Sequence, residues 1–173
     1  FHPSLFPGPH VRRRDTSPTV EYVASSRAVM WFRRDLRLAD HPALNAAVDA
    51  ADEVVPLFVV DPALWRPAGA VRREYLARSL HGLDADMGGA LIGRSGDPVE
   101  AGVALVRETG ASSVHVSADF GPYGAARDAA VERALAEIDV PLVRTGSPYA
   151  VAPGRVVKSD GTPYRVSSPF YRA

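Results

Sequence analysis

The stretch Val29–Asp40, VMWFRRDLRLAD, is the strongest indication of the fold. It contains most of a continuous apolar run, Ala28–Phe32, of the kind found in β-strands covered on both faces of a parallel sheet. The run changes abruptly into the charged segment Arg33–Arg37. Loops at the carboxyl ends of parallel strands are where open α/β sheets bind their ligands. The stretch therefore predicts a buried first strand that ends in a ligand-binding loop.

The charges of this loop also have a purely structural interpretation. Arg33 and Asp35 directly follow a strand that is expected at the centre of the sheet. Half-buried charges at such a place must be paired, and ion pairing within the turn would explain both residues without any ligand. The sequence leaves the two interpretations open.

Four more strand-like runs follow, each separated from the next by a segment with helical periodicity. This alternation predicts a parallel sheet. Right-handed crossovers then bring the loops at residues 33–37, 61–62 and 119–124 to one edge of that sheet. We therefore predict an α/β fold, a Rossmann-like doubly wound five-stranded parallel sheet in three layers. The expected strands are 28–32, 54–60, 90–94, 113–117 and 141–145, and the expected helices begin near Pro42, Gly69 and Pro98 and after Gly124.

Helical periodicity also predicts which side chains face the core. His115, which alternates with valines in the fourth strand, is expected to be structural. On the first two helices the expected apolar faces are Leu44, Ala47, Val48 and Ala51, and then Val71, Tyr75, Leu76, Leu80 and Leu83.

The ends of the chain differ from its middle. Four prolines interrupt residues 1–27, and Arg12–Arg14 is a short basic run, so we predict a disordered extension, with a nucleic-acid-binding arm as the alternative. Residues 28–150 are predicted to form the α/β domain. Residues 151–173 are rich in Gly, Pro and Ser and are expected to be irregular.

Composition excludes several classes of protein. The 173 residues are 46% hydrophobic and 23% charged, values that are normal for one globular domain. A formal net charge of zero argues against strong DNA binding by this chain alone. The chain has no cysteine for disulfides or thiolate chemistry. No apolar run approaches the roughly 18 residues of a membrane helix, so we expect no membrane association and a cytoplasmic location.

The motifs of common catalytic sites are missing from the sequence. Neither a GxGxxG after the first strand nor a GxxxxGK[ST] loop is found, and no GxSxG frames a nucleophile. The five histidines have no metal-ligand spacing. We therefore predict neither catalytic residues nor a metal site.

A second informative stretch is Asp119–Asp128, DFGPYGAARD. Its glycines permit close approach of a ligand to the backbone. Tyr123 offers a ring for stacking and a hydroxyl group, while the carboxylate of Asp119 can accept hydrogen bonds from a heterocycle. The alternative is a helix-initiating loop with a buried tyrosine.

Five motifs together resemble one known family. The chain is similar to the amino-terminal α/β antenna domain of class I DNA photolyases, within the photolyase/cryptochrome family. The motifs, in chain order, are WFRRDLRLAD (31–40), LFVVDP (57–62), GDP (96–98), PYGAARD (122–128) and YRVSSPFYRA (164–173).

The resemblance implies a role in light-driven repair of cyclobutane pyrimidine dimers. In this family the α/β domain can hold an antenna pigment, whereas FAD, the dimer and electron transfer belong to a helical domain that packs against it. Residues 151–173 would then begin the linker toward that domain, which this chain is expected to lack. By the same resemblance, the chain alone is expected to be inactive, and UV-damaged DNA is a partner of the full-length protein only.

The resemblance also suggests which pigment is bound. Folate-antenna photolyases carry an Asn-Glu pair where this chain has Tyr123 and Gly124, and the PYG form is similar to that of deazaflavin-antenna members. A deazaflavin is therefore expected rather than a folate. The chain departs from those members at Ala125, where they have an arginine. The candidate pigment-binding residues are Arg33, Arg34, Phe58, Asp119, Tyr123 and Gly124.

Two other functions remain open at this point. One is the light-signalling half of a cryptochrome, which the motifs do not separate from a repair enzyme. The other is a free-standing α/β module that binds a nucleotide-like ligand or a partner protein.

Overall fold

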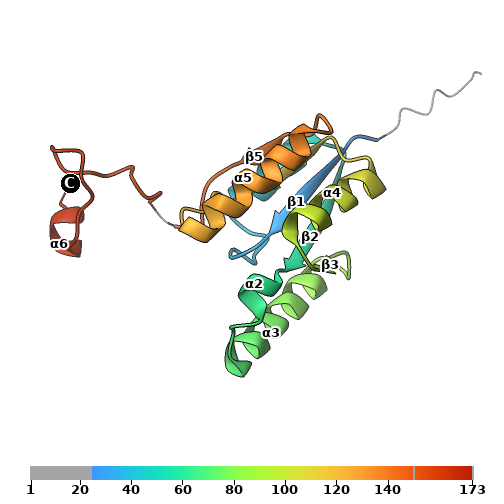
Figure 1. Cartoon of the computed structure of the whole chain (residues 1–173), viewed down its shortest axis with the longest axis horizontal. Helices are drawn as coiled ribbons and strands as arrows, with labels where there is room; N and C mark the ends of the chain where they lie inside the picture. Colours follow the sequence, from blue (N-terminus) through green and yellow to red (C-terminus); the bar gives the residue numbers. More distant parts are fainter. Residues whose placement is uncertain (1–24, 150, 173) are drawn as a thin grey trace, which may run out of the picture.

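The computed structural model describes residues 25–149 and 151–172, so most of the predicted extension at residues 1–27 lies outside the described residues. Five parallel strands form one sheet in the order β3-β2-β1-β4-β5, with β1 at its centre (Figure 1). This confirms the predicted α/β fold. The strands are β1 Arg27–Phe32, β2 Glu53–Val60, β3 Ile92–Ser95, β4 Ser113–Val116 and β5 Leu142–Arg144.

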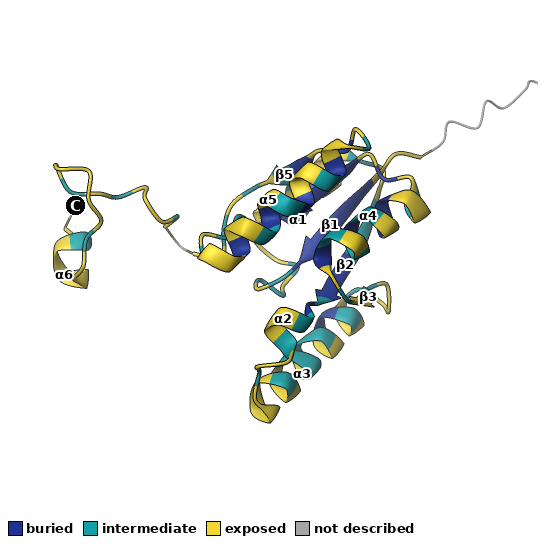
Figure 2. Ribbon diagram, in the orientation of Figure 1, coloured by how far each residue is buried: buried dark blue, intermediate teal, exposed yellow. Residues whose placement is uncertain are grey.

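Helices cover both faces of the sheet and complete three layers. On one face, Val29, Trp31 and Leu57 pack against α4 and α5. On the other face, Met30 and Phe32 pack against α1 and α3. Figure 2 shows the central strand β1 almost wholly buried between these layers. The helices are α1 Pro42–Ala50, α2 Pro62–Trp65, α3 Ala70–Asp86, α4 Pro98–Thr109, α5 Pro122–Ala136 and α6 Ser167–Phe170.

Helix starts follow the local sequence. The carboxylate of Asp97 accepts hydrogen bonds from the backbone N–H groups of Val99 (2.8 Å) and Glu100 (3.3 Å), and Pro98 occupies the first turn. His41 caps α1 in the same way, through a bond from the N–H of Leu44 to Nδ1 (3.2 Å). These side chains satisfy donors that lack a partner within the helix, which fixes where each helix leaves its loop.

Three predicted core positions are wrong. Val71 and Tyr75 on α3 are 85% and 75% exposed, and Val48 on α1 is also exposed. The side of α3 that packs on the sheet consists of Leu76, Leu80, Leu83 and Met87, one continuous helical stripe. At 100° per residue, Val71 and Tyr75 lie off this stripe. Two predicted boundaries were also wrong, since β3 begins at Ile92 rather than at residue 90 and α5 begins at Pro122 rather than after Gly124. The short helices α2 and α6 were not anticipated.

His115 is structural, as predicted. It is buried, and its Nε2 lies 3.0 Å from the hydroxyl of Ser113. His41 is also buried, with its ring edge-on to Phe32 at 5.5 Å. Burial lowers the pKa of both histidines below the ordinary value, against the opposing effect of Asp35 on His41.

The lowered pKa values of these two histidines predict that the folded chain loses stability in mild acid. Below pH about 6.5 the unfolded chain binds protons that the folded chain excludes, so the free energy of unfolding falls as pH drops through that value. We expect the urea midpoint to be lower at pH 5.5 than at pH 7.5. The variant His115→Gln should show a smaller difference, whereas His81→Gln, at an exposed position, should match the parent. A midpoint independent of pH over this range would contradict the prediction.

Candidate functional site

Three loops meet at the carboxyl edge of the sheet, as the topology predicts. They follow β1, β2 and β4, and they enclose a cleft of about 250 Å³. The hydroxyl of Tyr123, at the start of α5, donates to Oδ2 of Asp61, which follows β2. The guanidinium of Arg34 lies 3.6 Å from Oδ1 of Asp119. All six predicted site residues line this cleft, namely Arg33, Arg34, Phe58, Asp119, Tyr123 and Gly124.

A buried cluster of charges forms one wall of the cleft. Arg33 donates to Oδ1 of Asp128 and to the carbonyl oxygen of Ser117. Arg127 donates to the same Oδ1 at 2.9 Å and lies 3.4 Å from Oδ2 of Asp119. The side chains of Arg33 and Asp128 are only 8% and 3% exposed. Two guanidinium groups and two carboxylates therefore neutralise one another away from water.

The expected pairing of Arg33 is confirmed, but its partner comes from a distant part of the chain. Asp128 lies on α5, 95 residues away. Asp35 instead pairs with Arg37, at 3.1 Å. The loop after β1 is thus held by one ion pair within the loop and by a second that joins Arg33 to α5.

Aromatic rings lie beside these charges. The guanidinium carbons of Arg33 and Arg127 lie 5.0 and 5.3 Å from the ring centroid of Trp31. Arg127 also lies 6.0 Å from the ring of Tyr123. Such cation–π contacts are strongest where water is excluded. They hold the indole and phenol rings in fixed positions along the cleft.

The surroundings of Arg33 and Asp119 determine the protonation states of these two side chains. Burial, followed by the charge of Arg127, lowers the pKa of Arg33, although the arginine remains a cation at neutral pH. Burial alone would raise the pKa of Asp119. The N–H of Gly121 and the charges of Arg34 and Arg127 outweigh burial and hold that pKa below its usual value. Asp119 is therefore a carboxylate that accepts hydrogen bonds.

Tyr123 is fixed as a neutral phenol. Burial of its hydroxyl and the bond to Asp61 raise the pKa of Tyr123 to about 12. Oδ1 of Asp61 accepts from the N–H of Ala63 at 2.9 Å, which fixes the carboxylate in turn. The ring itself is partly exposed, so one part remains accessible from the cleft.

Position 124 requires glycine because the side chain of Asp119 packs closely against its backbone. A Cβ atom at this position would lie 2.7 Å from Oδ1 of Asp119 and closer still to Oδ2. The Asp119 carboxylate, which also accepts from the N–H of Gly121 at 3.1 Å, fills the space that a side chain would need. The first turn of α5 and the loop after β4 therefore fit together only with glycine at 124.

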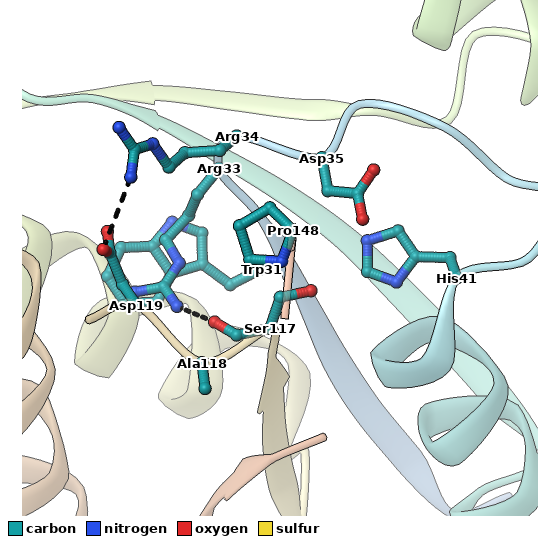
Figure 3. A pocket seen from close by; sticks show the side chains of 9 residues that line it. All are labelled: Trp31, Arg33, Arg34, Asp35, His41, Ser117, Ala118, Asp119 and Pro148. Atoms are coloured by element: carbon teal, nitrogen blue, oxygen red, sulfur yellow. Dashed lines mark hydrogen bonds and ion pairs between the residues drawn. The ribbon is translucent and has the colours of Figure 1, made fainter. Parts of the chain in front are cut away.

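A much smaller cavity adjoins the cleft (Figure 3). It measures about 10 Å³, close to the minimum for one water molecule. Oδ2 of Asp35 and Oγ of Ser117 line it, and both are buried without a hydrogen-bond partner among the described residues. Its polar walls suit one bridging water, and its size excludes an organic ligand.

Sequence reasoning did not name Trp31, Asp61 and Arg127, which line the cleft, or Asp128, which pairs with Arg33 in its wall, although all four lie within the quoted motifs. One signal was available for Asp128. It continues the helical stripe of Gly124, Val131 and Leu135, which are all buried on α5. A carboxylate on an otherwise apolar stripe needs a buried cation as partner.

The described residues hold no group of three or more His, Asp or Glu side chains that could bind a metal ion. Within the same part of the chain, no helix has the length and apolarity needed to cross a membrane.

Comparison with known proteins establishes the family. The sequence profile described as DNA photolyase matches residues 28–173. The chain belongs to the DNA photolyase family. It is 41% identical over 154 residues to deoxyribodipyrimidine photo-lyase of Streptomyces griseus, covering 85% of this chain and 34% of that protein. It is also 32% identical over 140 residues to cryptochrome-2 of Gallus gallus, covering 78% of this chain and 24% of the cryptochrome.

Solved structures agree with this assignment. A class III photolyase from Agrobacterium tumefaciens superposes with a TM-score of 0.80 at 31% identity, covering 90% of this chain and 33% of that one. An archaeal photolyase from Sulfolobus tokodaii shares the fold with a TM-score of 0.73 at 24% identity, covering 84% of this chain and 34% of that one. The chain thus spans about a third of the length of the photolyases it matches. Class I membership is not established, because the Agrobacterium structure belongs to class III.

Proposed function

We propose that this photolyase-family chain is an antenna domain whose cleft binds a deazaflavin-type chromophore. The observation that carries the proposal is the convergence of all six motif-derived residues on one cleft at the carboxyl edge of the sheet. In the complete protein, the bound pigment would absorb light for the FAD of a dimer-splitting DNA photolyase. FAD and UV-damaged DNA would bind outside this domain.

The chemistry of the cleft suits a flat heterocycle. Phe58 and the rings of Trp31 and Tyr123 line it with apolar surface. Ligand pockets of this kind combine aromatic walls with a few fixed polar groups. Asp119 is an ionised acceptor for a ring N–H, and the half-exposed Arg34 is a donor for a ring carbonyl. Fixed groups of both kinds would orient a ring that carries alternating N–H and C=O groups.

A deazaflavin is favoured over a folate by residues of the PYGAARD motif (122–128). Tyr123 and Gly124 stand where folate-binding members have Asn-Glu, and both line the cleft. Ala125, at the position of an arginine in similar deazaflavin-binding members, is exposed and lies outside the cleft lining. Arg127, two residues further on, supplies a guanidinium inside the cleft.

We expect the purified chain to bind 8-hydroxy-5-deazariboflavin more tightly than methenyltetrahydrofolate. The physical reason is that the cleft presents the ring of Tyr123 and the Asp119 carboxylate packed on Gly124, and lacks the Asn-Glu pair of folate-binding members. Fluorescence polarisation of each pigment during titration with the chain would measure both affinities. Tighter binding of the folate would refute the assignment of the pigment, and binding of neither would refute the antenna role.

A light-signalling role is the second candidate, supported by the similarity to chicken cryptochrome-2. Both classes share this domain, so the cleft does not separate them. Light-dependent loss of pyrimidine dimers from DNA, measured with a protein that carries this domain beside its flavin, would decide for repair.

A further inference from the structure

A second hollow continues from the cleft along α2 and α3. It measures about 420 Å³ and shares six residues with the cleft, including Arg34, Phe58 and Leu64. The residues that belong to it alone are Val60, Trp65, Ala68, Arg72, Arg73 and Leu76, and we name this part the α3 hollow. The cleft, at about 250 Å³, is smaller than the roughly 300–1,000 Å³ of typical ligand sites. A ligand of ordinary size would therefore extend into the α3 hollow.

The two compartments differ in charge. In the cleft, the positive charges of Arg33 and Arg127 are neutralised by Asp119 and Asp128. The α3 hollow adds Arg72 and Arg73 to its wall without an added acid. Asp61, which is shared with the cleft, is the one acidic residue among the described residues that line the second hollow as a whole, and its two oxygens already accept from Tyr123 and Ala63. The outer compartment thus carries uncompensated positive charge.

One of these arginines is held in place. Arg73 donates through Nε to the carbonyl oxygen of Trp65 (3.2 Å) and through Nη2 to that of Arg66 (2.9 Å). Its guanidinium lies 5.2 Å from the ring centroid of Trp65. These contacts fix a cation on the wall before any ligand arrives.

The neighbouring Arg72 is exposed at the rim. None of the ion pairs among the described residues involves Arg72. Both arginines lie in the first turn of α3, where a cation is disfavoured by the helix dipole and where no acidic residue compensates. A bound anion would offset this unfavourable placement.

We propose that the α3 hollow is a subsite for an anionic group, a phosphate, on the side chain of the chromophore, with Arg72 as its main ligand and Arg73 beside it. The heterocycle occupies the cleft, and its phosphorylated tail passes Phe58 and Leu64 into the α3 hollow. This inference rests on the proposed antenna function and narrows its ligand to a chromophore that bears a phosphate.

The test compares two ligands that differ only in the phosphate. The purified chain is titrated with 8-hydroxy-5-deazariboflavin and with its 5′-phosphate, with fluorescence polarisation as the readout. We expect the phosphate to bind about tenfold tighter, an advantage that shrinks as salt is raised. In Arg72→Gln most of this preference should be lost, through loss of affinity for the phosphate alone, and only the contribution of Arg73 should remain.

The control variant is Arg78→Gln. It makes the same change of charge on the same helix, outside both compartments, at a surface pair with Glu74. It should keep the preference for the phosphate. Equal affinity of the parent for both ligands would overturn the subsite and leave the antenna site standing. An unchanged preference in Arg72→Gln would overturn the role of Arg72, and binding of neither ligand would overturn both proposals.

Discussion

Replacing Asp128 by asparagine is expected to lower the free energy of unfolding by about 3–5 kcal/mol, the usual cost of removing one partner from a buried ion pair. Asp128 is the shared acceptor of Arg33 and Arg127, and all three side chains are at least nine-tenths buried. The asparagine side chain has nearly the same volume as the aspartate, so the substitution adds no cavity. It withdraws the negative charge and places an N–H₂ where the buried Oδ2 has no partner among the described residues.

A matched control lies one turn away on the same helix. Glu132 pairs with Arg144 at 2.7 Å, but the two side chains are 48% and 32% exposed. Glu132→Gln should therefore cost only about 0–1 kcal/mol. Urea denaturation of both variants, followed by tryptophan fluorescence, would compare the midpoints. Equal midpoints would show that the Asp128 charge does not hold the fold together.

The second large effect is expected from Gly124→Ala. The new methyl group would occupy the place of the Asp119 carboxylate, which must then leave the N–H of Gly121 and the guanidinium of Arg127. Overpacking of this kind typically costs about 1–3 kcal/mol in stability. Because Asp119 is also the proposed acceptor for the pigment, we expect affinity for 8-hydroxy-5-deazariboflavin to fall about tenfold or more.

Gly121→Ala separates this effect from a general intolerance of the loop. A Cβ atom at Gly121 would lie 3.5 Å from Oδ1 of Asp119, an ordinary contact, and its φ of −70° suits alanine. This variant should bind the deazaflavin like the parent. Equal loss of affinity in both variants would mean that any added methyl group disturbs the loop, and the particular role of Gly124 would be refuted.

The sheet, and the edge of it at which the cleft lies, could be predicted because both depend on sequence patterns along each strand. A buried strand needs a continuous apolar run, and parallel strands place their following loops at one edge, so Arg33, Asp119 and Tyr123 were expected near one another. The structure brings them to one cleft. Whether they hold a pigment is still a prediction.

Contacts between residues far apart in the sequence could not be predicted from local patterns. The partner of Arg33 could not be read from its neighbours, since Asp128 lies on another helix. Val71 and Tyr75 were expected in the core because apolar residues recur along α3, but they lie off the stripe of Leu76, Leu80, Leu83 and Met87 that meets the sheet. The α3 hollow depends on α2, a single turn of helix too short to show periodicity.

The 95 residues that separate Arg33 from Asp128 also bear on how the protein is made. Polypeptides are synthesised at about 5–20 residues per second, so Asp128 is added roughly 5–20 s after Arg33. β1 and β2 can meet early in that interval, whereas β4 and α5 are added later. Until then the cleft residues that follow β1 and β2 remain exposed to water. The binding site is therefore completed late in biosynthesis, and a pigment can join only a domain whose sheet has already closed around β1.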